Sequence, residues 1–193
     1  MSIVPDPPLS AYAPYFRAGV VAVVCQTVDG EPVFGQAAAA ELLRRVWAEM
    51  RAPISFELLG WAILPSRVHL LIRPRAGSRP LPLVRHLQRR YEQAWAQLMG
   101  MPGPLVVWAP AISLQRVQDL PDFARILDGI HYAAVAAGLV TRPEDWPHSS
   151  YAIWVERRLY KLGWGWARPE RLRSRGPGSH AGSGTARGGR DVG

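Results

Sequence analysis

Three polar side chains that could do chemistry, Arg67, His69 and Arg73, alternate with apolar residues in one short stretch of the chain. Successive side chains of a β-strand point to opposite faces, so Leu71 shares a face with these three residues. We expect this face to be chemical, and the other face to be core: Val68, Leu70 and Ile72. An imidazole can bind a metal ion, whereas a guanidinium stays protonated and is suited to phosphate.

The spacing of apolar residues predicts the elements that must position these side chains. The first half of the chain is predicted to form a strand at 20–27, a helix at 36–50, and strands at 54–64 and 68–73 joined by a Pro-Ser turn. A helix at 83–98 follows, and then candidate strands at 105–108 and 112–117, of which we retain one. The last predicted helix begins behind the cap Asp119 and ends near Gly138. This order predicts an α+β ferredoxin-like sandwich, an antiparallel sheet with helices mainly on one face.

The amino-acid composition narrows the class of partner that the chain is expected to bind. The 193 residues include 23 Lys and Arg against 15 Asp and Glu, giving a formal net charge of +8. Such an excess favours polyanionic partners, above all nucleic acid. The arginine-rich usage of a high-GC or thermophilic genome would produce the same excess, so charge alone leaves the partner open.

We expect one compact domain at 15–155, with an N-terminal extension at 1–14 and a C-terminal extension at 156–174. Residues 175–193 are mostly Gly, Ser, Arg and Ala, which predicts a disordered basic tail. A single cysteine, Cys25, excludes a disulfide framework and a cysteine-rich zinc site. The first eight residues lack the features of a signal peptide, and no apolar run is long enough to span a bilayer. We therefore expect a cytoplasmic, nucleoid-associated protein without a membrane partner.

Three segments of the chain resemble motifs of one known protein family. Residues 64–71 resemble the pattern Leu/Met-Pro-x-His-hydrophobic-His-Leu-Leu, and residues 128–140 the helix end Tyr-Ile-x-x-Asn-Pro-Val-x-x-Gly-Leu-Val. Residues 143–151 are similar to Pro-x-Asp-Trp-Pro-x-Ser-Ser-Tyr. Because the three motifs occur in the family's order and spacing over about residues 15–155, the chain specifically resembles the REP-associated tyrosine transposases, which are HUH transposases of the tyrosine type.

The resemblance implies an active site that this chain has altered. In the family, two histidines and an asparagine hold Mg²⁺ or Mn²⁺, and a tyrosine attacks single-stranded DNA to form a 5′-phosphotyrosine link. At these positions the chain has Arg67 and His69 for the histidines, Gly129 for the tyrosine and Ala133 for the asparagine. Only His69 keeps the family's residue. We therefore expect no catalytic residue and no cofactor, with His69 as a remnant of the metal site.

The sequence leaves three functions open. The first is a DNA-binding protein that recognises single-stranded or hairpin DNA without nicking it. The second is an active transposase that uses a relocated tyrosine, Tyr132, with Mg or Mn at His69; Tyr132 is predicted to lie nearly opposite the core stripe of its helix. The third is a non-catalytic interaction subunit of a nucleic-acid complex. A monomer and a homodimer are both compatible with the resemblance.

For the first function we predict one phosphate-binding surface without metal, in which the polar strand face joins the arginines of the following helix. Its residues are Arg67, His69, Arg73, Arg85, Arg89 and Arg90. The alternative for the strand is a solvated arginine beside a histidine that bonds to a backbone group. Trp164 and Trp166, close to the basic tail, are candidates to stack on unpaired bases or else to dock onto the domain.

Overall fold

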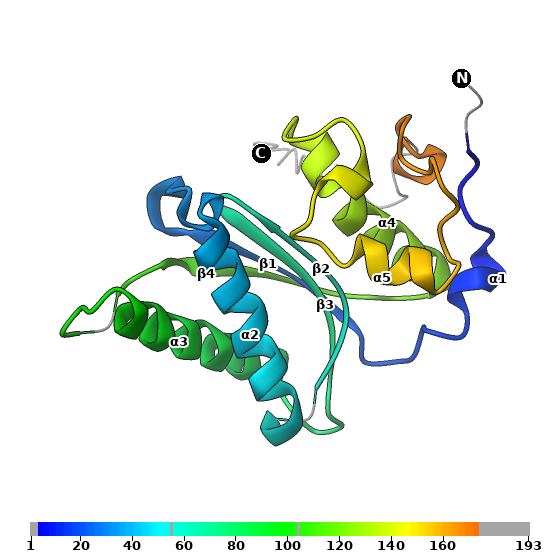
Figure 1. Ribbon diagram of the computed structural model, residues 1–193. Coiled ribbons are helices and arrows are strands. Elements are labelled where there is room, and N and C mark those ends of the chain that lie inside the picture. Colours follow the sequence, from blue (N-terminus) through cyan, green and yellow to red (C-terminus); the bar gives the residue numbers. More distant parts are fainter. Residues whose placement is uncertain (1–3, 55, 104, 174–193) are drawn as a thin grey trace, which may run out of the picture.

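The computed structural model, which describes residues 4–54, 56–103 and 105–173, contains a four-stranded antiparallel sheet of strand order β2-β3-β1-β4 (Figure 1). The strands are β1 (Val21–Thr27), β2 (Phe56–Leu64), β3 (Arg67–Pro74) and β4 (Trp108–Arg116). Leu64 pairs with Arg67, so Pro65 and Ser66 form the predicted two-residue turn. His69 lies in the interior of the sheet, opposite Val24 of β1 and Ala62 of β2.

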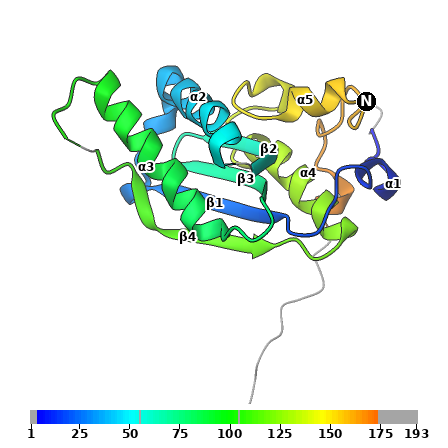
Figure 2. The same ribbon diagram turned by 90° about the horizontal axis from the view of Figure 1, so that it is seen from below.

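Helices cover both faces of this sheet (Figures 1 and 2). On one face lie α2 (Ala37–Ile54) and α3 (Pro80–Leu98), and on the other α4 (Leu120–Ala136) and α5 (Tyr151–Glu156). The predicted fold class, α+β with an antiparallel sheet, is confirmed. The helices are not mainly on one face, however, because the inner strands carry apolar side chains on both sides and both sides must be covered.

Two separate cores result from this arrangement. Val21, Val23 and Ile72 pack towards α2 and α3, whereas Ala22 and Leu71 pack towards α4. Leu71 is fully buried. The strand face that we expected to be chemical is therefore, at its centre, a second core.

The region after α3 contains one strand rather than two short ones. Its single strand, β4, lies at an edge of the sheet and pairs with β1. Pro110 is tolerated there because an edge strand has backbone groups that need no partner within the sheet.

The start and end of α4 agree with the sequence. The Asp119 side chain accepts a hydrogen bond from the backbone N–H of Asp122 at 2.8 Å, and Pro121 occupies the first turn. Gly138, with φ of +70°, adopts the left-handed conformation that commonly ends a helix.

The segments predicted as extensions are packed onto α4. The short helix α1 (Leu9–Tyr12) and the 3₁₀ turn η4 (Glu170–Leu172) both contact it, and Tyr12, Tyr160 and Trp164 belong to the second core. The predicted basic tail at 175–193 lies outside the described residues. None of the described helices is long and apolar enough to cross a membrane.

A matched pair of glycine substitutions tests how closely α4 approaches the sheet. A Cβ at Gly60 would lie 2.6 Å from Leu127 Cδ1, which is buried, whereas the nearest such atom to a Cβ at Gly129 is Leu172 Cδ2 at 3.8 Å. We expect Gly60→Ala to lower the free energy of unfolding by about 1–3 kcal/mol through overpacking. Gly129→Ala should raise it by about 0.5–1 kcal/mol, because glycine is unfavourable inside a helix. Urea unfolding measures both, and equal effects would contradict the packing described here.

Candidate nucleic-acid interface

The four residues that share the polar face of β3 have different environments. Arg67, at the start of the strand, is exposed, and its guanidinium makes no hydrogen bond or ion pair with the rest of the described chain. His69 is half-buried, and Leu71 lies in the second core. Arg73, at the far end, forms an ion pair with Glu57 of the neighbouring strand. The predicted continuous polar face is therefore divided in two by Leu71.

His69 is held in its neutral form. Burial, and then the positive charge of Arg67, lower the pKa of its imidazole to about 4. At neutral pH the ring therefore offers one N–H donor and one lone pair, but no positive charge. Of the two residues, Arg67 is the one that can attract a phosphate by charge.

The arginines of α3 do not extend this surface. Helix α3 covers the face of the sheet opposite to the one that carries Arg67 and His69. Arg85 donates a hydrogen bond to the carbonyl of Pro110 in β4, while Arg89 and Arg90 are exposed on the outer side of the helix. The prediction of one joint phosphate surface is wrong, because the sequence pattern shows which side of a helix is polar but not which face of the sheet that helix covers.

The two altered positions of α4 differ in exposure, since Ala133 is buried and Gly129 is only partly buried. Ala133 is 9% exposed and belongs to the second core, and Leu172 of the C-terminal segment approaches the position of Gly129. Tyr132 was expected to point nearly opposite the core, but it is partly buried and packs against that core. Its Cδ2 atom lies 3.6 Å from the Cβ position of Gly165. The C-terminal segment therefore closes over this side of α4.

The family's metal does not fit the residues at these positions. An arginine offers no lone pair to a cation, and an alanine has no donor atom, so His69 stands without the other two ligands. Mg²⁺ and Mn²⁺ prefer several oxygen ligands in octahedral geometry. Across the described residues, no group of three or more His, Cys, Asp or Glu side chains is placed to hold a metal ion.

The two tryptophans differ in their access to solvent. Trp164 is 1% exposed, stacks on Tyr160 with ring centroids 4.1 Å apart, and donates from Nε1 to Asp6 at 3.2 Å. It docks onto the domain and is not available to stack on a base, which corrects its place among the candidate binding residues. Trp166 is 38% exposed, donates to Glu144 at 2.5 Å and lies under the guanidinium of Arg142.

A buried polar network below α4 was not predicted. Asp128, which is fully buried, accepts hydrogen bonds from Tyr12 at 2.6 Å and from Tyr160 at 2.9 Å, and forms an ion pair with Arg171. Arg171 also donates to the Tyr12 hydroxyl at 2.9 Å and to the carbonyl of Pro7 at 2.6 Å. The network therefore joins both terminal segments to the middle of α4.

His131 extends this network to the sheet. Its Nδ1 lies 2.9 Å from the Tyr160 hydroxyl, and its Nε2 lies 2.8 Å from Ser150 Oγ, which accepts from the Trp61 backbone N–H. Because Tyr160 donates to Asp128, its oxygen accepts from Nδ1–H, so Nε2 must accept from Ser150. Burial lowers the pKa of His131 to about 3 and keeps the ring neutral. The hydrogen bond from Ser150 to His131 resembles that of the Ser-His pair in hydrolases. Both residues are buried, however, so this pair has a structural role.

The motif at 143–151 also has a structural role. Trp146 Nε1 donates to the carbonyl of Ile63 at 3.0 Å, and the backbones of His148 and Ser150 bond to Ile63 and Trp61. Ala62 forms a β-bridge with Ser149. This segment therefore covers the outer edge of β2 and protects it from pairing with another chain.

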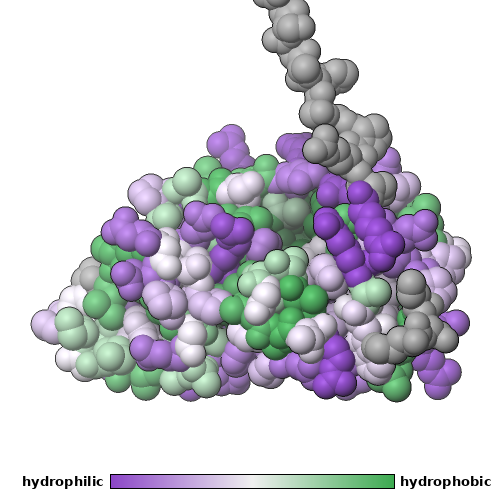
Figure 3. All heavy atoms as spheres, turned by 90° about the horizontal axis from the view of Figure 1, so that it is seen from above, coloured by the Kyte–Doolittle hydropathy of each residue, from purple (hydrophilic) through white to green (hydrophobic). Residues whose placement is uncertain are grey.

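Figure 3 shows the molecule from above the view of Figure 1, on the side of α4 and α5, and the surface there is partly hydrophilic and partly hydrophobic. Hydrophilic side chains alternate with several hydrophobic areas, one of which lies near the middle of the view.

Comparison with known proteins agrees with the motifs. A REP-associated tyrosine transposase of Escherichia coli K12 is 23% identical over 124 residues, which are 64% of this chain and 72% of that protein. The solved structure of a REP-associated tyrosine transposase bound to a REP hairpin superimposes with a TM-score of 0.65 and 20% identity, over 78% of this chain and 87% of that one. The predicted resemblance to the REP-associated tyrosine transposases is confirmed. The fold is theirs, although no protein-family model matches the chain.

Removal of Arg171 tests whether the buried network holds the transposase-like fold together. Burial raises the pKa of the Asp128 carboxyl to about 6 despite its hydrogen bonds and the charge of Arg171. Arg171→Met leaves that carboxylate buried without its cation, and we expect a loss of about 3 kcal/mol in the free energy of unfolding at pH 8. The loss should be smaller at pH 5, because the carboxyl pKa is raised and the native state then takes up a proton that the unfolded chain does not.

Urea unfolding at the two pH values measures this difference. Arg173→Met, at an exposed position two residues further along, is the matched control and should have little effect at either pH. An equal loss for Arg171→Met at pH 5 and pH 8 would contradict a role for the Asp128 charge.

Proposed function

We propose that this chain binds single-stranded or hairpin DNA and does not cut it. The observation that carries this proposal is the set of residues at the family's catalytic positions, where Gly129 and Ala133 can supply neither a nucleophile nor a ligand. Arg67 places a fixed positive charge beside His69 instead. The solved transposase with the same fold holds a REP hairpin, which supports hairpin DNA as the target.

The positive charge of Arg67 can contribute to DNA binding, but it cannot by itself support DNA cleavage. Phosphate contacts from arginine give affinity through charge and bidentate hydrogen bonds, and they need no metal. Cleavage needs, in addition, an activated nucleophile held in line with a polarised phosphate. Arg67 is exposed and has no acidic partner among the described residues, so its guanidinium is available to a phosphate.

DNA cleavage by a relocated tyrosine is the less favoured function. Tyr132 packs against the second core and lies beside Gly165, so its ring is fixed by the C-terminal segment. A shift into the catalytic position would have to displace that segment. The metal would still lack two of its three ligands.

Arg67→Ala tests the proposed interface. With a fluorescein-labelled DNA hairpin, we expect the variant to bind about three- to tenfold more weakly than the parent protein, since one charged phosphate contact is lost. The slope of log K against log salt should become shallower by about 0.7–0.9, as expected for one released counterion. Fluorescence anisotropy at several salt concentrations measures both quantities.

The control for this experiment removes an equal charge elsewhere. Arg45 lies on the exposed side of α2, on the other face of the sheet, and Arg45→Gln should leave affinity and slope close to those of the parent. If Arg67→Ala behaved like this control, the interface would not be at Arg67. If the parent protein bound neither hairpin nor single-stranded DNA, the proposed function would be wrong.

A further inference from the structure

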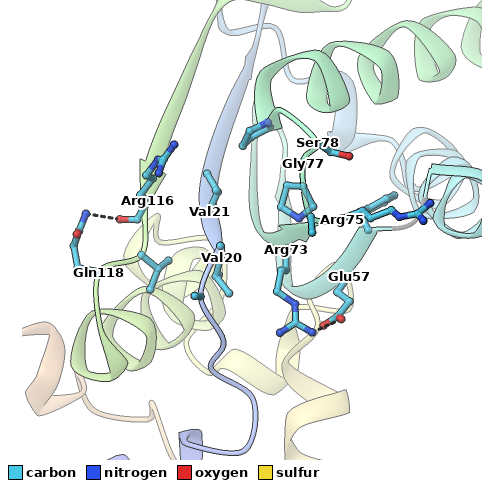
Figure 4. Close-up of a pocket in the computed structure, with 16 residues that line it drawn as sticks. Val20, Val21, Glu57, Arg73, Arg75, Gly77, Ser78, Arg116 and Gln118 are labelled. Carbon is cyan, nitrogen blue, oxygen red and sulfur yellow. Dashed lines mark hydrogen bonds and ion pairs between the residues drawn. The ribbon is translucent and has the colours of Figure 1, made fainter.

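A cavity of about 990 Å³ lies at the end of the sheet, away from His69. It is bounded by the start of β1, the ends of β3 and β4, and the loop that leads into α3. Figure 4 shows Arg116 of β4 and Arg73 of β3 on opposite sides of Val20 and Val21. Its volume is at the upper end of the range for sites that bind small ligands.

The walls of this cavity combine an apolar floor with a positive rim. The apolar part of the lining that keeps some exposure consists of Pro74, Ala76 and Pro80, whereas Val20 and Val21, which also line the cavity, are only 1% and 5% exposed. Arg116 is exposed, and its guanidinium has no hydrogen-bond partner in the described chain. Among the described lining residues Glu57 alone is acidic, and Arg73 neutralises it. The rim therefore keeps a positive charge that is free to meet an anion.

The loop before α3 leaves the cavity open. Ser78 N–H donates to the carbonyl of Arg75 at 2.9 Å, which closes a tight turn, and Gly77 has a φ of +82°. A Cβ at Gly77 would meet no atom within 4 Å. Figure 4 shows Arg75 turned away from the space between Arg116 and Arg73. This turn therefore forms a wall without filling the cavity.

Helix α3 adds a second source of positive potential. It begins at Pro80, a lining residue, runs for 19 residues, and has no acidic residue in its first turn. Pro80 and Pro82 have no backbone N–H, and the Leu83 N–H bonds to the Arg79 carbonyl, so the positive potential at this end comes from the helix dipole rather than from several free N–H donors. Arg116 pairs with Val21, whose side chain faces α2 and α3, so Arg116 and the start of α3 lie on the same face of the sheet.

We propose that this cavity binds an unpaired nucleotide of a DNA strand, at a site separate from Arg67 and His69. Arg116, aided by the dipole of α3, holds the phosphate, and the apolar part of the lining, which includes Pro74, Ala76 and Pro80, accepts the apolar faces of sugar and base. The chemistry recognised is that of a nucleoside phosphate, which could come from a strand or from a free nucleotide. We assign the strand, and this choice rests on the proposed function, because the chain's +8 charge and open cavity suit a polyanion.

Two substitutions at exposed positions test separately the charge of Arg116 and the open volume of the cavity. Arg116→Gln removes the free guanidinium, and Ser78→Trp fills the mouth of the cavity without changing its charge. With fluorescein-labelled dT12, we expect Arg116→Gln to raise the Kd about fivefold and to lessen the salt slope by about 0.7, the value for one single-strand phosphate. Ser78→Trp should raise the Kd by a similar factor with no change in slope. Arg45→Gln serves as the matched control, and thermal unfolding of each variant checks that the fold is kept.

The same titrations distinguish this site from the proposed interface at Arg67. Unchanged dT12 affinity in both Arg116→Gln and Ser78→Trp would overturn the cavity proposal, while weaker hairpin binding by Arg67→Ala would leave the proposed function standing. If dTMP bound as tightly as dT12 and lost affinity in the same two variants, the ligand would be a free nucleotide and the strand assignment would be wrong.

Cross-linking locates the site without any variant. A dT12 strand that carries one 4-thiothymidine is irradiated with the parent protein, and the joined peptide is identified by mass spectrometry. Cross-links within 73–80 or 116–118 are expected. Cross-links confined to the neighbourhood of Arg67 would contradict the proposal.

Discussion

The buried carboxylate of Asp128 is the constraint on which the arrangement of this molecule depends. It lies in the middle of α4, and it can remain there because Tyr12, Tyr160 and Arg171 supply hydrogen bonds and a cation from segments far away in the chain. The hydrogen bonds and the ion pair that stabilise the Asp128 carboxylate therefore hold the N-terminal and C-terminal segments against the same helix. His131 continues the network to Ser150 and so to the sheet.

This constraint also explains why the C-terminal segment lies beside one of the family's catalytic positions on α4, Gly129. Gly129 follows Asp128 directly, and the segment that delivers Arg171 brings Leu172 to the space beside it. The β3 face is divided by Leu71 for a related reason, since α4 must be packed against apolar side chains. What remains accessible is Arg67 at one end of the strand and a cavity at the other. The guanidinium of Arg67 suits a phosphate better than a divalent metal.

Much of this fold follows from local sequence patterns. The Asp119 cap with Pro121, and the two-residue turn between β2 and β3, depend on residues that are close neighbours, so the sequence alone predicts them. The placement of α3 and α4 on opposite faces does not follow from such patterns, because periodicity shows which residues are apolar but not what covers them. The Asp128 network joins residues up to 164 positions apart, and no local signal marks it. For the same reason the sequence leaves open whether Trp164 stacks on bases or docks onto the domain, because its partner Asp6 lies 158 positions away.

We propose that this fold binds DNA and lacks the residues to cut it. The most direct measurement incubates the purified protein with a 5′-labelled hairpin that carries single-stranded flanks, in the presence of Mn²⁺, and separates the products on a denaturing gel. The account predicts intact hairpin and no slower-migrating species, under conditions in which anisotropy shows the hairpin to be bound. A labelled band of protein covalently joined to DNA, lost on substitution of Tyr132 by Phe, would contradict it.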